Sequence, residues 1–395
     1  MTPAARVQAA IELLDAIIDA ARGGGAAADT LIARYFATRR YAGSKDRRAV
    51  RELVYAAIRR AGEMPTSGRA ALLGLADDQP DLVALFDGSA HGPAVITEGE
   101  PRAPAGVAPG WLIDALAGSG VTREALPALL ERAPLDLRAN RLRITQAAML
   151  EAFPEAAPTP HAPYGLRLPS GSAIEQSAAF RDGLIEVQDE GSQLVGLAAD
   201  VRPGMNVIDL CAGAGGKTLA LAAAMENSGH IIACDSDRAR LSRLAPRAAR
   251  AGVTNVETRL LDPEREMEAL ADLAGQADRV LIDAPCSGTG TWRRNPEARW
   301  RLTPERLARL VALQARLLVL AAGLVKPGGS LAYIVCSLLD EEGARQVDAF
   351  LAAHDGWVAE AVEIGAGTPH GAGVRLEPHR DLTDGFFVAR VRAPC

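Results

Sequence analysis

The chain has 395 residues and a net charge of −6, so it is long enough for two or three domains, and its total charge does not predict a nucleic-acid partner. None of its five cysteines forms a C-x-x-C pair and no histidines cluster at metal-ligand spacing, which excludes the common zinc sites. With no secretory signal and no apolar run of roughly 18 residues, we expect a cytoplasmic protein with reduced thiols, no metal and no membrane span.

Residues 1–128 predict an all-helical domain. In the first segment, apolar side chains recur at helical spacing at Val7, Ile11, Leu14 and Ile18. The stretch from Arg34 to Arg60 carries nine basic residues against two acidic ones. Such a stretch is typical of a solvated helix face and equally of a surface that holds nucleic-acid phosphates, so both interpretations stay open.

Residues 129–178 predict a small α/β module. Strands are expected at Pro134–Asn140 and Gly165–Pro169, and Thr145 is a typical cap for a short helix between them. The module is too short to hold a large core of its own. Residues 179–395 make up the third predicted domain.

A glycine-rich turn at Cys211–Thr218 follows the predicted strand Met205–Leu210 and precedes a helix. A phosphate-binding P-loop would need glycine at Cys211, and a dinucleotide fingerprint would need it at Thr218, so both patterns miss by one residue. The third interpretation is a turn whose backbone approaches the amino-acid end of S-adenosylmethionine. Asp235 ends the next strand, twenty residues after Gly215, at the spacing where an acid takes ribose hydroxyls of any nucleoside cofactor.

Asp262 ends a further predicted strand, Val256–Leu261. Its carboxylate is within reach of an adenine amino group if the cofactor lies across these strand ends. A surface acid in the polar run Asp262–Arg265 is an equally good interpretation.

Two short apolar runs in the last third of the chain each end in Cys-Ser. One precedes Asp283 and Cys286–Ser287, and the other precedes Cys336–Ser337. Between them, Thr303 and Pro304 begin a predicted helix that ends at a Pro-Gly-Gly stop. Strand, helix and strand form a parallel crossover, and ligands of open parallel sheets bind at the carboxyl ends of the strands. We therefore expect two thiols and one carboxylate to meet at one edge of the sheet.

Such a pair of thiols suits methylation of carbon 5 of a pyrimidine. That carbon is not nucleophilic until a thiolate adds at carbon 6, and a thiol of pKa about 8.5 is mostly protonated at neutral pH, so the site must activate it. Asp283 could hold the base edge at N3 while charge develops there. A second thiol could help to remove the proton from carbon 5 before the first thiol is eliminated.

The segment Trp292–Arg301 interleaves arginines with two tryptophans. Guanidinium groups on phosphates and indoles on bases would suit single-stranded RNA. The alternative is that at least one tryptophan packs in the core.

The last predicted strand is Gly385–Val391, expected to be antiparallel at or near the edge of the sheet. The glycine-rich residues 365–373 before it are expected to form a loop.

At these motifs the chain resembles the Nol/Sun family of RNA 5-methylcytosine methyltransferases. Asp283–Gly288 and Cys336–Ser337 resemble two motifs of the family's catalytic domain, and Cys211–Thr218 resembles its cofactor motif. The order of a basic helical domain, a small α/β module and a catalytic core is similar to the bacterial RsmB (Sun, Fmu) branch. The resemblance implies a Rossmann-like class I S-adenosylmethionine-dependent methyltransferase core, a NusB-like helical domain and an RRM-like module.

The resemblance also implies roles for individual residues. Cys336 would be the nucleophile, Cys286 would assist product release, and the substrate would be a cytosine of 16S ribosomal RNA. Ala214 stands where the family often has proline, and Val335 where threonine often precedes the nucleophile. The S-adenosylmethionine site would be lined by Cys211, Ala212, Gly213, Ala214, Gly215, Gly216, Lys217, Asp235, Asp262 and Asp283.

Other functions remain compatible with the sequence. A P-loop NTPase conflicts with Cys211 at a glycine position. A catalytically silent RNA-binding assembly factor would not need both thiols together with Asp283 and Asp235. Transfer RNA is an alternative substrate to ribosomal RNA. For the enzyme we expect a monomer that binds RNA through the Arg34–Arg60 and Trp292–Arg301 regions.

Overall fold

The structure is a computed structural model that describes residues 1–169 and 171–395. The chain divides into two compact units, which are described separately. The first consists of Met1–Glu131 together with Thr291–Thr303, and the second of Arg132–Gly290 together with Pro304–Cys395.

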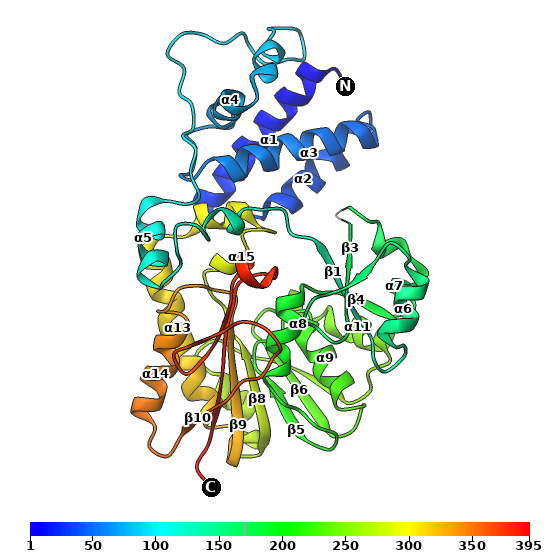
Figure 1. Cartoon of the computed structure of the whole chain (residues 1–395), viewed down its shortest axis with the longest axis vertical. Helices are drawn as coiled ribbons and strands as arrows, with labels where there is room; N and C mark the ends of the chain where they lie inside the picture. Colours follow the sequence, from blue (N-terminus) through cyan, green and yellow to red (C-terminus); the bar gives the residue numbers. More distant parts are fainter. Residues whose placement is uncertain (170) are drawn as a thin grey trace. The chain divides into compact units, whose positions relative to one another are not determined.

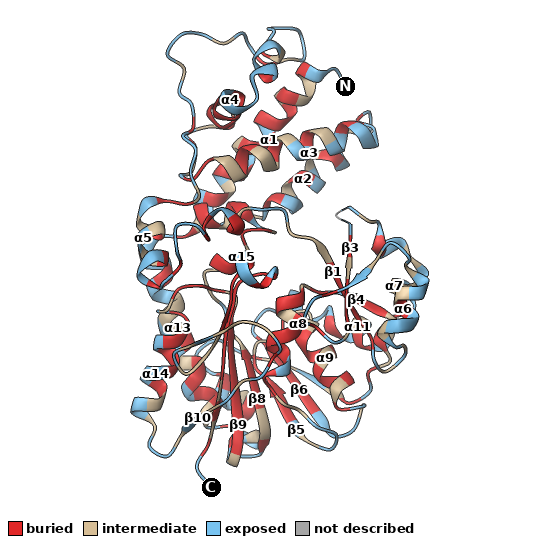
Figure 2. Cartoon of the chain, in the orientation of Figure 1, coloured by how far each residue is buried: buried red, intermediate tan, exposed pale blue. Residues whose placement is uncertain are grey.

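Helices form the first unit, as the apolar spacing predicts. Thr2 caps the first helix by accepting the N–H of Ala5, and Pro3 occupies the first helical position. The predicted apolar face, with Val7 and Leu14, lies in the buried core of the unit (Figure 2). The helices are α1 Pro3–Gly23, α2 Ala28–Ala37, α3 Ser44–Arg60, α4 Gly68–Asp78 and α5 Gly110–Gly118, with short 3-10 turns at Pro80–Leu85, Pro127–Leu129 and Pro296–Arg301.

The segment Trp292–Arg301 belongs to the core of this helical unit, so its prediction as an RNA-binding surface is wrong. Trp292 is fully buried, and the buried Trp300 donates its indole N–H to the carbonyl of Ala61 at 3.1 Å. The fully buried guanidinium of Arg299 donates to the carbonyls of Ile58 at 2.5 Å and Ala61 at 2.8 Å. These carbonyls lie at the carboxyl end of α3, where a positive charge is favoured. Packing and helix capping therefore account for the Trp-Arg pattern.

The second unit begins with a small antiparallel sheet in the order β2-β3-β1-β4. Both predicted strands are present, and Thr145 caps the helix between them as predicted. The sheet continues past the expected boundary at residue 178, because β4 pairs with β1 through Leu137 and Val187. The elements are β1 Leu135–Ala139, α6 Gln146–Ala152, β2 Ala157–Pro158, β3 Gly165–Leu168, a 3-10 turn Ile174–Gln176, α7 Ala178–Arg181 and β4 Ile185–Val187.

A larger sheet follows, in the order β11-β12-β13-β9-β8-β5-β6-β7. The strands from β9 to β7 are parallel, and β8, α13 and β9 form the predicted crossover, with α13 beginning at Pro304. The parallel strands are β5 Asn206–Asp209, β6 His230–Asp235, β7 Val256–Leu260, β8 Ala277–Asp283 and β9 Val325–Val335.

Helices cover both faces of this sheet (Figure 1). Side chains of β8 alternate between two cores: Val280 and Ile282 pack with α13 and α14, and Leu281 packs with α8 and α9. Burial on both faces is why these strands are continuously apolar. The helices are α8 Glu190–Leu197, α9 Gly216–Ala224, α10 Arg238–Leu241, α11 Leu244–Ala251, α12 Glu266–Leu270, α13 Pro304–Ala322, α14 Ala344–Ala353 and α15 Pro378–Asp381, with 3-10 turns at Ala271–Leu273 and Thr289–Thr291.

The carboxyl-terminal strand β13, Phe386–Arg392, is antiparallel to β9 as predicted, but it lies inside the sheet. Beyond it lies β12, and the glycine-rich residues predicted as a loop include β11, which pairs with β12 through Thr368 and Arg375. The remaining strands are β10 Val358–Glu360, β11 Thr368–His370 and β12 Gly373–Leu376. No helix in the described ranges is long and apolar enough to cross a membrane.

Candidate active site

The thiols of Cys286 and Cys336 lie 3.3 Å apart, as the two strand ends predict. Cys286 follows β8 and Cys336 follows β9, and these strands are paired up to Asp283 and Ile334. The hydrogen bond with Cys336, together with burial, raises the pKa of the Cys286 thiol well above its ordinary value. The two sulfurs are therefore hydrogen-bonded to each other, and either one can be the donor.

A buried hydrogen-bond network ties the two thiol-bearing loops together. Ser287 donates its N–H to the carboxylate of Glu342 at 2.8 Å, and its hydroxyl bonds the other carboxylate oxygen. The hydroxyl of Ser337 lies 3.2 Å from that of Ser287 and 3.1 Å from that of Thr289. Gln314 of α13 donates to the same Glu342 carboxylate at 3.0 Å. One fully buried acid thus joins the Cys286 loop to the chain that follows Cys336.

Glu342→Ala should lower the free energy of unfolding by about 2–4 kcal/mol, because the N–H of Ser287 loses its acceptor and the Gln314 amide keeps only its bond to the carbonyl of Pro285. Urea denaturation followed by circular dichroism measures this change. Glu341→Ala is the matched control, since the neighbouring Glu341 is exposed and forms only a 4.0 Å pair with Arg345. Equal stability of the two variants would contradict the bracing role of Glu342.

Asp283 forms an ion pair with Lys217. Its carboxylate lies 2.7 Å from the Lys217 ammonium, which also donates to the hydroxyl of Ser192 at 3.3 Å. The Lys217 side chain is almost buried, whereas that of Asp283 is 34% exposed. The pair links the end of the glycine-rich turn to β8, the strand that leads to Cys286, and a contact of the Asp283 carboxylate with the thiols stays a prediction.

Backbone contacts hold the glycine-rich turn against the end of β6. Asp235 accepts the N–H of Gly213 at 2.7 Å and that of Asp237 at 2.7 Å. Gly213 and Gly215 have φ angles of 56° and 87°, and a Cβ on Gly215 would lie 2.6 Å from Leu244. Glycine is therefore required at both positions, and α9 begins directly afterwards with its N–H groups at the edge of the sheet.

Two further groups lie beneath this turn. Burial raises the pKa of the Cys211 thiol well above its ordinary value, so Cys211 is a neutral packing residue. Burial also raises the pKa of Asp209 to about 7, although Thr218 donates to its carboxylate at 2.7 Å.

The buried Asp209 predicts a pH dependence of stability. Its folded pKa lies above the ordinary value of about 4, so the folded state binds the proton more tightly and stability falls as pH rises from about 4 to 7. Asp209→Asn removes this titration and keeps an acceptor for Thr218. The stability of the wild type relative to Asp209→Asn should therefore decrease between pH 4.5 and 8 in urea denaturation. A pH-independent difference would contradict the raised pKa.

Asp262 lies just beyond β7, beside the end of β6. The N–H of Leu261 donates to the carbonyl of Asp235 at 3.0 Å, while the Asp262 side chain is 70% exposed and lies 3.8 Å from Arg265. Its position at the strand ends suits the predicted adenine contact, and its exposure suits the surface interpretation, so the contact remains a prediction.

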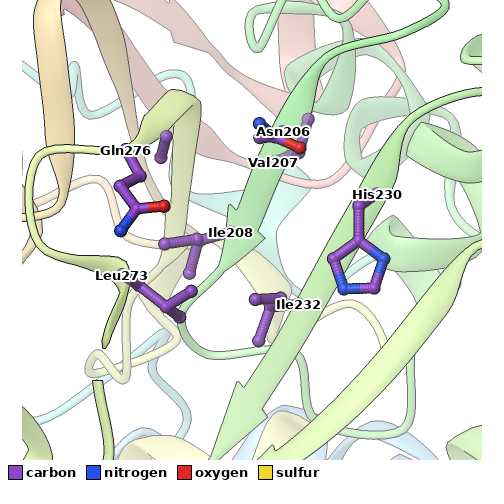
Figure 3. Close-up of a pocket in the computed structure, with 8 residues that line it drawn as sticks. Asn206, Val207, Ile208, His230, Ile232, Leu273 and Gln276 are labelled. Carbon is purple, nitrogen blue, oxygen red and sulfur yellow. The ribbon is translucent and has the colours of Figure 1, made fainter. Parts of the chain in front are cut away.

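A pocket of about 160 Å³ lies at the opposite edge of the sheet (Figure 3). Asn206, His230 and Ala277, which line it, are the first residues of β5, β6 and β8. It is therefore separate from the thiol pair at the carboxyl ends. Within residues 1–169 and 171–395, no group of three or more His, Cys, Asp or Glu side chains could hold a metal ion.

The sequence interpretation missed three groups that hold this site: Glu342, Gln314 and Ser192. The first two lie on or before amphipathic helices, where a glutamate or glutamine is normally a solvated residue. Ser192 follows the capping residue Asp189, and this local pattern predicts a helix start without indicating a partner for Lys217.

Comparison with known proteins identifies the family. Residues 197–392 match the model of the family described as 16S rRNA methyltransferase RsmB/F. A protein of Synechocystis sp. named probable ribosomal RNA small subunit methyltransferase B is 35% identical over 300 residues, covering 72% of this chain and 66% of that protein. Ribosomal RNA small subunit methyltransferase B of Pectobacterium atrosepticum is 35% identical over 66% of this chain and 60% of its own length. The matches thus span 60–66% of the length of these curated relatives, which is less than two thirds.

Solved structures show the same fold. The crystal structure of PH0851 has a TM-score of 0.79 and 25% identity, and the match covers 99% of both chains. A methyltransferase homolog protein from Pyrococcus horikoshii has a TM-score of 0.59 and 27% identity over 72% of this chain and 99% of its own. The predicted class I S-adenosylmethionine-dependent methyltransferase core is therefore confirmed. By its family model, its curated relatives and its fold, the chain belongs to the RsmB/F methyltransferase family.

Proposed function

We propose that this protein is an S-adenosylmethionine-dependent RNA cytosine-5 methyltransferase that acts on 16S ribosomal RNA. The observation that carries the proposal is the thiol pair Cys286–Cys336, 3.3 Å apart, beside the Asp283–Lys217 pair. Attack at carbon 6 of a pyrimidine needs one activated thiol, and release of the 5-methylated product needs a second proton-transfer group. The names of the curated relatives support ribosomal RNA of the small subunit as the substrate.

The residues around the glycine-rich turn fit S-adenosylmethionine. Gly213 and Gly215 carry no side chains and give the turn its left-handed backbone angles, and the amino end of α9 offers N–H groups and a positive dipole to a carboxylate. We propose that the turn from Cys211 to Lys217 holds the amino-acid end, with Asp235 at the ribose and Asp262 at the adenine. The cofactor supplies an electrophilic methyl group.

The chain's own residues activate the cytosine. The hydrogen bond with Cys336 and burial raise the pKa of Cys286 well above its ordinary value, so the proposal assigns the attack to Cys336. The Cys336 sulfur adds to carbon 6, and the electron pair of the 5,6 double bond makes carbon 5 nucleophilic. Asp283, positioned by Lys217, holds the base edge at N3. Carbon 5 then accepts the methyl group.

The second thiol completes the reaction. The hydrogen bond with Cys336 is the largest cause of the raised pKa of Cys286. Once Cys336 is bonded to carbon 6, this interaction with a thiolate is absent, and the Cys286 pKa falls. Cys286 can then release its own proton to solvent and, as a thiolate, take the proton from carbon 5. This restores the 5,6 double bond and expels Cys336 as a thiolate, and the proton lost to solvent is the net proton of the reaction. The Cys286 thiol and the Cys336 thiolate are then ready for the next addition.

Incubation of the purified protein with methyl-labelled S-adenosylmethionine and unmethylated 16S ribosomal RNA tests the proposal. Nucleoside analysis should find the label in 5-methylcytidine. Label in another nucleoside, or no transfer to any RNA, would overturn it, and transfer only to transfer RNA would replace the substrate.

The proposed enzyme acts as a monomer in the cytoplasm. The thiol pair, Asp283 and the turn all come from one chain, so the site needs no second copy. Two thiols in contact remain reduced only in a reducing compartment, which supports the cytoplasm.

We propose that the basic segment Arg34–Arg60 binds RNA phosphates. Arg34, Arg40, Lys45 and Arg48 are exposed, and the neighbouring Tyr41 is 72% exposed, which suits stacking on a base. By contrast, Arg51 lies 2.5 Å from Asp29. The four exposed basic side chains are thus accessible to phosphates, which supports the proposal.

Lys45→Glu combined with Arg48→Glu should weaken RNA binding and lower the slope of log affinity against log salt concentration by about 1 to 2, because two phosphate contacts are lost. Titration of RNA at several salt concentrations measures the slope. Arg123→Glu with Arg132→Glu, two exposed arginines outside the segment, makes the same change in charge and is the control. Equal slopes for the two double variants would favour the solvated-face interpretation.

A further inference from the structure

Arg247 of α11 bridges the glycine-rich turn and the small sheet. One guanidinium nitrogen donates to the carbonyl of Ala214 at 2.6 Å, and the other lies 2.7 Å from the carboxylate of Glu186 on β4. Glu186 is only 4% exposed and also binds Arg250, which lies one turn along the same helix. The buried acid is thereby compensated by two arginines, of which Arg247 contacts the turn.

A second arginine reaches the same turn from the small sheet. Arg138 of β1 is directly opposite Glu186 in the β1–β4 pair, and its buried guanidinium donates to the carbonyl of Gly216 at 3.0 Å. The small sheet therefore contacts the turn in two ways, directly through Arg138 at Gly216 and through Glu186, which holds Arg247 at Ala214.

The direction of these carbonyls fixes the direction of the following N–H groups, because a trans peptide is planar and its C=O and N–H point opposite ways. With the Ala214 carbonyl on Arg247, the N–H of Gly215 points to the carbonyl of Ala212, where it bonds at 2.9 Å. Gly215 could otherwise let the Ala214–Gly215 peptide turn over, since glycine readily adopts other backbone angles. The arginine contacts remove that freedom.

We propose that Arg247, anchored on Glu186, is a positioning residue that holds the turn in its cofactor-binding conformation, so that the small sheet forms part of the S-adenosylmethionine site. The inference rests on the proposed function and deepens it. A turn held in one conformation before binding loses less entropy when the cofactor arrives, which strengthens binding without any direct contact.

Calorimetric titration with S-adenosylhomocysteine tests the proposal in the full chain. Arg247→Met should weaken binding about tenfold, as expected for loss of a charged hydrogen bond that orients the site. Arg250→Met is the matched control: it removes the other arginine on Glu186, has a similar exposure and leaves the Ala214 contact in place, so its affinity should stay within about twofold of the wild type. Arg247→Lys should restore binding only in part, because an ammonium cannot bridge both partners as a guanidinium does.

Two further measurements separate positioning from general destabilisation. In Arg247→Met, the amides of residues 212–217 should exchange hydrogen faster than in Arg250→Met, and KM for S-adenosylmethionine should rise while kcat stays nearly constant. Equal affinity and equal exchange in the two variants would overturn the proposal. If the wild type itself does not bind S-adenosylhomocysteine, the proposed function fails. The hydrogen-exchange measurement still tests whether Arg247 holds the glycine-rich turn in one conformation.

Discussion

Cys336→Ala should abolish methyl transfer, with a loss of at least about 10³-fold, because carbon 5 of cytosine is not nucleophilic unless a thiolate has added at carbon 6. The variant should also form no covalent RNA adduct. Cys286 is assigned only the later proton transfer, so it should not replace Cys336 in the attack on carbon 6. Transfer of labelled methyl to 16S ribosomal RNA measures the loss.

The control for this variant is Cys395→Ala, which removes an exposed thiol at the end of the chain. It should keep wild-type activity. Retention of substantial activity in Cys336→Ala would mean that another group makes the bond to carbon 6, and the assignment of the nucleophile would be wrong.

Cys286→Ala should fail at a later step. Addition of Cys336 and methylation of carbon 5 need no proton from Cys286, but removal of the carbon 5 proton does need a base. The variant should therefore accumulate a protein–RNA adduct that survives denaturing electrophoresis, while multiple turnover falls by about 10²–10⁴-fold, the usual contribution of a positioned base.

The adduct distinguishes the two possible orders of the thiols. Accumulation in Cys336→Ala and its absence in Cys286→Ala would exchange the two roles. Cys286 would then be the nucleophile, as in the related DNA enzymes, whose Pro-Cys motif supplies the attacking thiol. Cys286→Ser is a useful second variant, because a hydroxyl keeps the shape of the site but is a poor base at neutral pH.

The meeting of the thiols could be predicted because parallel topology carries the information. Cys286 and Cys336 each come shortly after an apolar run, and adjacent parallel strands end at the same edge of the sheet. The place of the glycine-rich turn was predictable for the same reason, because the turn directly follows the parallel strand β5. Local sequence determines both where a strand ends and which residues come directly after it.

The sequence alone could not decide whether Trp292–Arg301 packs in the core or binds RNA. Tryptophan suits both roles, since its indole can be buried in a core or stacked on a base. Trp300 and Arg299 satisfy their donors on the last carbonyls of α3, more than two hundred residues earlier in the chain. The Arg247–Glu186 and Glu342–Gln314 contacts are likewise between distant segments. Such pairs depend on tertiary packing, and no local spacing indicates them.

Bisulfite sequencing of total RNA from a strain that lacks the gene, complemented with the wild type or with Cys336→Ala, tests the central claim most directly. One cytosine of 16S ribosomal RNA should be protected from conversion with the wild type and converted both in the deletion strain and with Cys336→Ala. Unchanged protection across all three strains, or a change confined to transfer RNA, would contradict the account.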